Sequence, residues 1–404
     1  MDTVATQSTS LSSPPKIWWS NAIFFVSVHV AAAAGAYYCP PNHVHPASLM
    51  LAFLTWQLAD FGITVGYHRL YSHRAFKATL PVRIILAVLG SAGFQGSIKW
   101  WTLRHRLHHR FTDDTEHDPY AATRGLFYSH MGWIFYKPVY LKMDLIDRED
   151  LERDPVVRLQ HKYYVPIASL TGFALPVLLG HFWNDRRGAF VWAGLVSRLF
   201  IWHSTFLVNS LAHWDGLQPY SDEDTSRGNL ILALLTGGEG SHNFHHTFPH
   251  DFRSGPSRFA WDPSKWIILA LNRLGLVHSL RRARQVDMDN SIKYMDTKSV
   301  HGHVQEPVPQ WQGAEWTIQD IREELSMSPS RCFVVLGDWV VDATSYLKEH
   351  PGGASLIRKY SIKINEPERT KEDATWAFEG GLNNHSRAAR WRLEELRVAR
   401  FVQG

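Results

Sequence analysis

Four long apolar segments divide the first half of the chain into two pairs. They cover residues 17–38, 47–65, 163–183 and 189–211. Each is close to the roughly 20 residues that a helix needs to cross a bilayer, so the pattern predicts two transmembrane hairpins. Two shorter apolar runs, 81–95 and 229–235, are predicted to lie at the membrane interface or to pack on the helices.

The hairpins also predict an orientation. Two hairpins place the N-terminus, residues 67–162 and everything after His213 on one side of the membrane. Residues 67–162 contain many Lys and Arg, whereas the loop at 39–46 contains none, so this side is predicted to be cytosolic. The second turn, with Arg186 and Arg187, argues mildly the other way. The expected protein is multi-pass with both termini in the cytosol.

Three histidine clusters fall on this predicted cytosolic side. The chain has 23 His, and the clusters read HRLYSH, HRLHH and HNFHH. Imidazole suits iron, zinc and copper, and spacings of three and four place side chains on one face of a helix. With Asn209 and His213 at the end of the fourth span, the clusters predict a metal centre of more than one ion. A histidine-rich metal transporter would instead place its ligands, with carboxylates, near the membrane midplane. The clustered histidines are His68, His73, His105, His108, His109, His242, His245 and His246.

Composition narrows the remaining possibilities. Aromatic residues make up 13% of the chain, with 17 Trp, which is typical of membrane-interface belts. Cys39 and Cys332 are the only cysteines, which excludes a disulfide framework and a thiolate metal site. The net charge of +4 and the lack of a basic stripe argue against nucleic-acid binding. Residues 1–16 are rich in Ser, Thr and Pro and are predicted to be disordered, and the polar range 287–311 is predicted to be a linker.

Residues 312–404 predict a second, small α+β domain. WTIQDIREEL is a candidate short helix, and CFVVLGDWVVDATSYL predicts two strands around a Gly-Asp turn. HPGG follows at 350–353, where the proline fixes the backbone and the glycines permit a tight turn against a flat ligand. A further histidine, His385, stands in the segment NNHSRAA.

The order and spacing of these motifs resemble a known family. GITVGYHRLYSHRAF, HRLHHRFTD with DPY, NSLAHW and GEGSHNFHHTFPHDFR are similar to the membrane acyl-CoA desaturases of the stearoyl-CoA (Δ9) type, over about residues 20–280. KWW at 99–101 and SHMGW at 129–133 resemble the fungal branch, and 312–404 resembles the cytochrome b5 haem domain. The resemblance implies a mainly α fold, with four transmembrane helices, a cytosolic helical cap and a fused α+β haem-binding domain.

The resemblance also implies cofactors. One iron would be held by His68, His73, His105, His109 and His245, and the other by His108, His213, His242 and His246, with Asn209 acting through a water. Asp118 or Glu239 would orient the rings. His350 and His385 would be the axial ligands of a haem b, although the polar insert SIKINEPERTKED makes their interval longer than in ordinary cytochrome b5. The implied reaction uses O₂ and two electrons, because a methylene in the middle of a fatty acid has no acidic proton for a side-chain base to take.

Substrate and partners follow from the same resemblance. The substrate would be a long-chain acyl-CoA, the electron donor an NADH-cytochrome b5 reductase, and the location the endoplasmic reticulum membrane. Candidate substrate contacts are Trp101 and Phe206, with Arg104 and Lys137 as partners for CoA phosphates or as solvated surface charges. Asp60, a carboxylate inside a predicted span, either binds a polar acyl substituent, shortens the acyl tunnel, or bonds to neighbouring helices. Two other functions stay open: a related di-iron hydroxylase or desaturase of a specialised acyl group, and a non-enzymatic metal transporter or haem-bearing sensor.

Overall fold

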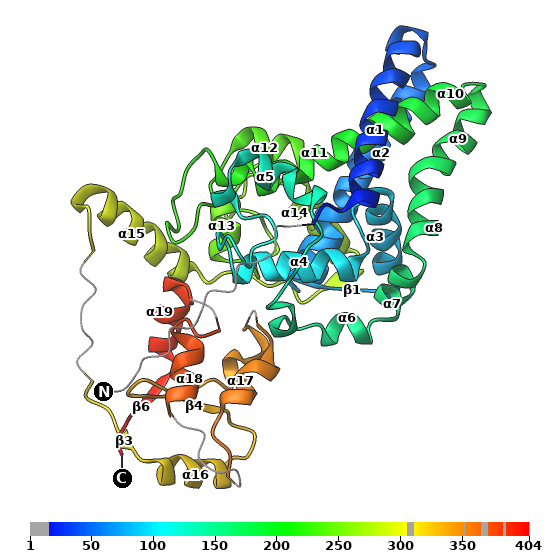
Figure 1. Cartoon of the computed structure of the whole chain (residues 1–404). Helices are drawn as coiled ribbons and strands as arrows, with labels where there is room; N and C mark the ends of the chain where they lie inside the picture. The colour runs from blue at the N-terminus through cyan, green and yellow to red at the C-terminus, as the bar shows by residue number, and fades with distance from the viewer. Residues whose placement is uncertain (1–15, 305–310, 351, 365–370, 383–384, 404) are drawn as a thin grey trace, which may run out of the picture.

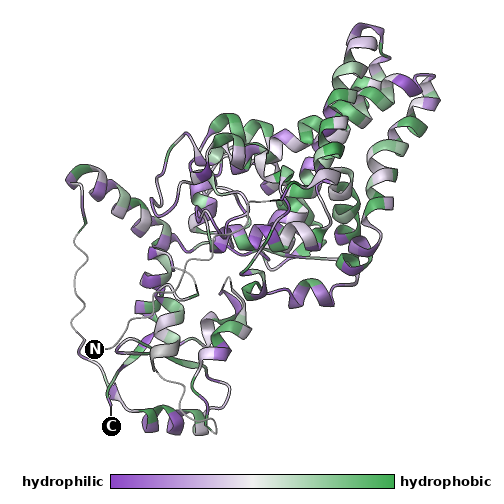
Figure 2. Ribbon diagram, in the orientation of Figure 1, coloured by the Kyte–Doolittle hydropathy of each residue, from purple (hydrophilic) through white to green (hydrophobic). Residues whose placement is uncertain are grey.

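The computed structural model describes residues 16–304, 311–350, 352–364, 371–382 and 385–403. Figure 1 shows long helices projecting from one end, a cap of shorter helices in the middle, and the C-terminal domain on the opposite side of the cap. Figure 2 shows that hydrophobic residues dominate the projecting helices, whereas the C-terminal domain is mixed. The predicted disordered segment lies outside the described residues, apart from Lys16.

All four predicted spans are present as apolar helices long enough to cross a membrane. The first is α1 (Trp19–Tyr38), and the second is α2 (Pro46–Phe61) continued by the π-helical η2 (Gly62–Ser72). The third joins α8 (Tyr164–Ser169), η6 (Leu170–Ala174), α9 (Leu175–Gly180) and η7 (His181–Trp183). The fourth joins α10 (Arg186–Ala189), η8 (Phe190–Val196), α11 (Ser197–Asn209) and η9 (Leu211–His213).

The second and fourth spans are longer than a bilayer core requires. They contain 27 and 28 residues. At 1.5 Å per residue each is about 40 Å long, against a hydrocarbon core of about 30 Å. Both ends that lie in the cap carry candidate ligands, His68 in η2 and His213 in η9. The excess length is therefore enough to place these histidines beyond the hydrocarbon core.

The cap packs around the end of the second span. Gly62 permits the closest approach, because a Cβ there would lie 2.2 Å from the backbone nitrogen of Gly90 in α3 (Leu80–Ala92). The predicted short apolar run at 81–95 thus packs on the helices. The other run forms α12 (Leu230–Leu235), which exposes Leu230, Ile231 and Leu234 as an interfacial helix would. Fully buried core side chains include Phe76, Ile98, Leu107, Val157 and Phe252.

The helix α4 (Ile98–Arg110) crosses the centre of the cap and carries three candidate ligands. Its start is defined by Ser97, whose hydroxyl accepts from the backbone N–H of Trp100 at 3.2 Å. The short η1 (Pro41–His43) lies in the loop between α1 and α2, away from the cap. The other cap elements are η3 (Ala122–Arg124), α5 (Leu126–His130), η4 (Gly132–Phe135), η5 (Met143–Leu145), α6 (Glu149–Arg153), α7 (Pro155–Lys162), α13 (His242–Thr247), α14 (Pro263–Arg273), and the antiparallel pair β1 (Lys77–Ala78) and β2 (Val277–His278).

The range predicted to be a linker is not without structure. Residues Gln285–His301 form the helix α15, so more than half of the range 287–311 predicted to link the two domains is helical. The helix is polar on most sides and buries only Met288 and Ser291, which leaves no amphipathic period to find in the sequence. Contacts with other segments stabilise it, including an ion pair between Lys298 and Asp222.

The C-terminal domain is the predicted α+β unit. Its four-stranded sheet has the order β3-β6-β5-β4, and Gly337, with φ +58°, turns β4 into β5 as predicted. Phe333, Val340, Ala399 and Ile321 form its buried core. Its elements are β3 (Glu315–Trp316), α16 (Ile318–Met327), β4 (Phe333–Leu336), β5 (Trp339–Asp342), η10 (Ser345–Lys348), α17 (Ala354–Tyr360), α18 (Lys371–Phe378), α19 (Arg387–Glu395) and β6 (Arg397–Phe401).

Candidate metal centre

Nine histidines converge in the cap as two groups. Within each group the nitrogen atoms that could bind a metal all lie within 4.8 Å of one another. The first histidine group is His68, His73, His105, His109 and His245, and the second is His108, His213, His242 and His246. The membership of each group is the same as that expected for each iron from the sequence.

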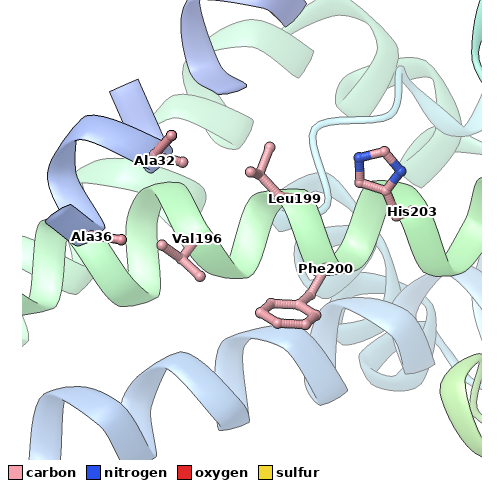
Figure 3. A pocket seen from close by; sticks show the side chains of 7 residues that line it. Ala32, Ala36, Val196, Leu199, Phe200 and His203 are labelled. Atoms are coloured by element: carbon pink, nitrogen blue, oxygen red, sulfur yellow. The ribbon is translucent and has the colours of Figure 1, made fainter. Parts of the chain in front are cut away.

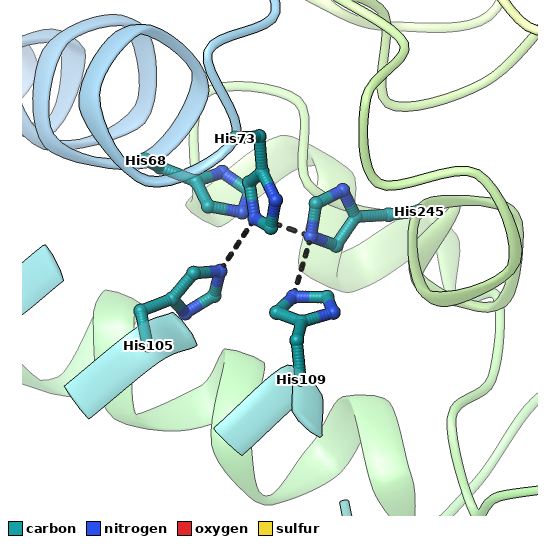
Figure 4. A group of neighbouring side chains, drawn as sticks. All are labelled: His68, His73, His105, His109 and His245. Carbon is teal, nitrogen blue, oxygen red and sulfur yellow. Dashed lines mark hydrogen bonds between the residues drawn. The ribbon is translucent and has the colours of Figure 1, made fainter. Parts of the chain in front are cut away.

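The first histidine group draws its rings from η2, the turn after it, α4 and α13 (Figure 4). Its Nε2 atoms point at one another: His73 and His105 are 2.8 Å apart, and His245 lies 3.0 Å from both His68 and His109. Nitrogen atoms this close together cannot all carry a hydrogen, so several of them present a lone pair to the same small volume. That volume suits a cation.

The second histidine group lies directly beside the first. The Nε2 atom of His242 lies 3.1 Å from that of His213 and 3.0 Å from that of His246. The rings of His109 and His246, from different groups, stack with centroids 4.3 Å apart. The helices α4 and α13 supply rings to both groups, because residues three and four apart on a helix share a face. Two metals here would be neighbours.

Oxygen atoms behind the rings fix their orientation. Nδ1 of His108 lies 2.9 Å from Oδ1 of Asp118, and Nδ1 of His68 lies 3.3 Å from Oε1 of Glu239, so both carboxylates expected to orient rings do contact them. A Nδ1–H bonded to oxygen leaves Nε2 unprotonated, which is the form that binds a metal.

Two further contacts of this kind escaped sequence reasoning. Asp224 lies 3.5 Å from Nδ1 of His246, and the Thr225 hydroxyl lies 2.9 Å from Nδ1 of His213. Both belong to the loop after η9, in the segment SDEDT. Three acids and a threonine so soon after His213 were the available signal, but the direction of their side chains depends on the folded loop.

A buried arginine holds one of these carboxylates. The guanidinium of Arg69 donates to Oε1 of Glu239 at 2.9 Å, to Asp262 at 3.0 Å and to the carbonyl of Phe252 at 3.0 Å. All three charged side chains are nearly inaccessible to solvent. Breaking such a buried network typically costs about 3–5 kcal/mol, so Glu239 is held firmly behind His68.

The electrostatic environment favours neutral imidazoles. Burial, followed by repulsion from neighbouring histidines, lowers the pKa of His73, His105, His109, His242 and His245 well below the ordinary value. Neutral rings keep the lone pair that coordinates a cation. The donor set, nitrogen throughout, fits iron, zinc or copper and does not fit calcium or magnesium.

The pKa values of Glu239 and His108 shift in the directions that favour the charged forms of these two side chains. Burial raises the pKa of Glu239, but the cation of Arg69 and the ring of His68 outweigh it and lower that pKa to about 2. Burial also opposes the charge on His108, yet the Asp118 carboxylate raises the pKa of that ring above its usual value. Glu239 is therefore anionic at neutral pH.

The remaining predicted site residues occupy different surroundings. Trp101 stacks on His105, with centroids 4.9 Å apart and planes at 21°, so it borders the first histidine group. Asn209 is the half-buried last residue of α11, four positions before His213. Phe206 is buried and packs edge-on against His130 and Trp133.

The two predicted phosphate-binding cations differ. Arg104 is not a solvated surface charge: it is 7% exposed, its guanidinium lies 3.3 Å from the centre of the Trp100 ring, and Nε donates to the Tyr140 hydroxyl at 2.7 Å. Cation–π contact with an aromatic ring explains how the charge can be enclosed. Lys137 is exposed.

Asp60 is buried inside the second span, and it is 3% exposed. Its Oδ2 has no hydrogen-bond partner among the described residues, while the indole of Trp56 lies within hydrogen-bonding reach of the carboxyl group. The same indole N–H lies 3.3 Å from the hydroxyl of Ser204 in the fourth span. Among the described residues, the carboxyl group of Asp60 therefore connects to the fourth span only through Trp56 of its own helix.

One apolar cavity of 370 Å³ lies between α1 and α11 (Figure 3). Its only polar lining side chain is His203, which Figure 3 shows at one end of the cavity. None of the predicted substrate residues lines it. Its walls are Ala32, Ala33, Ala36, Val196, Leu199, Phe200 and His203.

A separate histidine pair lies in the C-terminal domain. The rings of His350 and His385 are 6.4 Å apart and nearly parallel, at 24°. Their Nδ1 atoms lie 3.1 Å from the carbonyl of Gly353 and 2.8 Å from that of Phe378, which leaves both Nε2 atoms free. Two metal–nitrogen bonds of about 2.0 Å, with ring centres about 1.1 Å behind each nitrogen, require about 6.2 Å between centroids. The pair therefore fits one metal between two axial imidazoles.

Burial keeps this pair neutral as well. It lowers the pKa of His350, and it lowers that of His385 to about 4. The cation of Arg110, at the end of α4, contributes to both shifts. The histidine pair thus lies close enough to the cap for the charge of Arg110 to affect the pKa of both rings.

Comparison with known proteins agrees with this geometry. The profile of the family described as "Fatty acid desaturase" matches residues 40–253, a range that contains both histidine groups. The sequence is 38% identical over 366 residues to Acyl-CoA desaturase 1 of Saccharomyces cerevisiae, covering 88% of this chain and 68% of the yeast protein. Because residues before 312 make up only about three quarters of the chain, that match includes part of the C-terminal domain.

Two animal proteins match a shorter part. The sequence is 36% identical over 285 residues to Delta(9)-fatty-acid desaturase fat-6 of Caenorhabditis elegans, covering 69% of this chain and 83% of that protein. It is 40% identical over 248 residues to Acyl-CoA Delta(11) desaturase of Trichoplusia ni, covering 59% and 69%. The part of the chain that precedes the C-terminal domain, with its spans and histidines, accounts for most of what is shared.

Proposed function

The chain belongs to the fatty acid desaturase family, and on that premise we propose that it is an oxygen-dependent acyl-CoA desaturase that introduces a Δ9 double bond into a saturated long-chain acyl-CoA. One observation carries the proposal: nine buried or half-buried histidines from four separate segments meet as two adjacent groups at one end of two spans. The yeast relative is named an acyl-CoA desaturase, and the nematode relative a Delta(9) desaturase.

The two histidine groups are the proposed iron sites. The first would hold one iron, the second would hold the other, and Asn209 would contribute through a water. Two bound irons and O₂ would supply the oxidant that takes two hydrogens from an unactivated acyl group, while two electrons and two protons complete the reduction of O₂ to water. The protein's own part is to keep the rings neutral, to orient them through Asp118, Glu239, Asp224 and Thr225, and to exclude water.

Substrate contacts are proposed from position. Trp101 would border the reacting part of the acyl group, because its ring stacks on His105. Phe206 and Asp60 would limit the acyl group from the fourth and second spans, and exposed Lys137 would contact a CoA phosphate. Arg104 instead supports the aromatic wall formed by Trp100 and Tyr140. Fixing one methylene near the metals would set the double-bond position by geometry.

Electrons would arrive through the C-terminal domain. His350 and His385 would bind haem b as axial ligands, which suits electron transfer because neither axial position stays open for O₂. The haem would be re-reduced one electron at a time by an NADH-dependent cytochrome b5 reductase. The protein would lie in the endoplasmic reticulum membrane with both termini in the cytosol, as the charge asymmetry of its loops predicts.

The alternative of a metal transporter is less consistent with the arrangement. A transporter would hold its ion near the midplane of the spans. Here the nitrogen ligands cluster in the cap, where α4 and α13 lie outside the four apolar helices. A specialised acyl substrate is the variation that Asp60 keeps open.

The test is complementation of a yeast strain that lacks its own Δ9 desaturase, with fatty-acid profiling by mass spectrometry. The wild-type protein is expected to restore 9-unsaturated C16 or C18 acids, and His108→Ala is expected to abolish them. His117→Ala is the matched control, because His117 pairs with Asp114 outside both groups. Unsaturation at another position would correct the regiochemistry. A lack of any unsaturated product, with iron bound in the purified protein, would refute the proposal.

A further inference from the structure

The loop that follows η9 touches the second histidine group. Asp224 lies 3.5 Å from Nδ1 of His246, and Thr225 lies 2.9 Å from Nδ1 of His213. The helix α13 holds the loop in place, because the Asn243 side chain in α13 accepts from the backbone N–H of Tyr220 at 2.9 Å. Asp113 likewise accepts from the backbone N–H of Thr225 at 2.7 Å. The loop is therefore part of the metal centre's support.

The same loop touches the C-terminal domain on its other side. Both carboxylate oxygens of Glu223 accept from the backbone N–H of Arg387 at 2.9 Å, at the start of α19. The neighbouring carboxylate of Asp222 lies 3.2 Å from the guanidinium of Arg387. Arg387 is two residues after His385, the proposed haem ligand. Adjacent residues of the loop thus contact the second histidine group on one side and the segment next to His385 on the other.

Contacts around this point fix the approach of the two domains. The guanidinium of Arg387 lies 3.5 Å from the centre of the Tyr294 ring in α15. Arg284, just before α15, makes two hydrogen bonds to Glu395 in α19, at 2.6 and 2.9 Å. Ala388 packs against the buried cluster that contains Phe244 of α13. Charged and apolar contacts together hold α19 against α15 and against the apolar cluster that includes Phe244.

We propose that residues Asp222–Thr225 are the docking element for the C-terminal domain and make the second histidine group the entry point for electrons. This inference rests on the proposed haem and iron sites. The connection runs from His385 through two residues to the Arg387 N–H, across the hydrogen bond to Glu223, and through Asp224 to His246. In each step a reduced haem loses one electron, and the metal centre gains it. The NADH-dependent reductase then restores the haem.

The test uses the full-length protein in detergent or lipid nanodiscs, with the double variant Asp222→Asn, Glu223→Gln. These substitutions keep side-chain size and remove both charges. The haem is reduced anaerobically, mixed with O₂ and stearoyl-CoA, and its reoxidation followed by stopped-flow absorbance. We expect reoxidation at least about tenfold slower than in the wild type, with unchanged haem and iron content. Glu323→Gln, on the exposed face of α16, is the matched control and should leave the rate unchanged.

Hydrogen–deuterium exchange gives a second readout that needs no haem. In the double variant, exchange in 217–228 and 385–395 should rise together, because the charge-assisted contacts that join the two segments are lost. Unchanged exchange would overturn the docking assignment. Increased exchange with an unchanged reoxidation rate would overturn the electron-entry assignment. A protein without a Soret band would refute the haem proposal separately, and docking would then be decided by exchange alone.

Discussion

The buried carboxylate of Asp118 lies 2.9 Å from Nδ1 of His108. This contact fixes which nitrogen of the ring faces the other histidines, because a ring that donates Nδ1–H presents Nε2 as a free lone pair. The other oxygen of Asp118 accepts from the backbone N–H of Asp113 at 3.0 Å, so the carboxylate is itself held in position.

We expect Asp118→Asn to lower iron affinity or activity by about 10- to 100-fold, as loss of a partner behind a metal-bound histidine typically does. Iron content of the purified variant, measured by mass spectrometry together with desaturation rate, checks this. Asp114→Asn is the matched control, because Asp114 makes the same kind of contact with His117 outside both groups. Full iron content and full activity in Asp118→Asn would contradict the expectation.

Stability of the cap should fall at acidic pH because of Asp150. Burial opposes the charge of this carboxylate, but hydrogen bonds from Arg106 and Arg74 outweigh burial and hold its pKa well below the usual value. A depressed pKa contributes stability above the unfolded value of about 4, and that contribution is lost as the pH falls below it. Asp150→Asn should therefore melt at a lower temperature than wild type at pH 7, with a smaller difference near pH 3.

Thermal melts in detergent across this range measure the effect. Glu149→Gln serves as the control, because the Glu149–Arg153 pair is exposed and contributes little. If acidification lowered the melting temperatures of the wild type and of Asp150→Asn by the same amount, the assignment of this acid sensitivity to Asp150 would be wrong.

Asp60 should influence which acyl groups are accepted. Asp60→Ala opens space in the second span and removes a carboxylate whose Oδ2 lacks a hydrogen-bond partner in the described structure. We expect a shift of the product profile towards longer acyl groups without loss of stability. Asp60→Asn keeps the volume and should keep the profile. Competition between C16 and C18 acyl-CoA, analysed by mass spectrometry, distinguishes these outcomes. An unchanged ratio in Asp60→Ala would assign Asp60 a purely structural role.

Arg110 should raise the reduction potential of the proposed haem. Its Nε and one terminal nitrogen are buried without a hydrogen-bond partner among the described residues, and its charge acts on both His350 and His385. A nearby cation favours the reduced haem, because reduction removes one positive charge. We expect Arg110→Gln to lower the potential by roughly 1 kcal/mol, or about 40 mV for one electron. Arg110→Lys should keep it, and potentiometric titration of the Soret band decides.

The spans and both histidine groups could be predicted because their signals are local. Apolar length identifies a span, and the HRLHH and HNFHH spacings place rings on one helix face. The division of the nine histidines between two sites came from family resemblance, since spacing alone does not say that His108 and His109, adjacent in sequence, belong to different groups. The structure brings them together as expected.

What sequence reasoning missed depends on contacts between distant segments. Asp224 and Thr225 reach the histidines only because Asn243 and Asp113 hold their loop. The helix α15 has no apolar period of its own and is stabilised by partners such as Asp222. Arg104 is enclosed by Trp100 and by Tyr140, which is 36 residues away. None of these arrangements has a repeating pattern along the sequence.

The length of the second and fourth spans has a consequence for how the acyl group is kept away from water. These helices are about 10 Å longer than the hydrocarbon core is thick, which is enough to place His68 and His213 outside the layer in which acyl groups dissolve. Each methylene drawn from lipid into water costs about 0.8 kcal/mol, so about eight of them would cost roughly 6 kcal/mol. The protein must therefore act as solvent for the acyl group, and side chains such as Trp101, which stacks on His105, continue the dry environment of the bilayer up to the histidine groups.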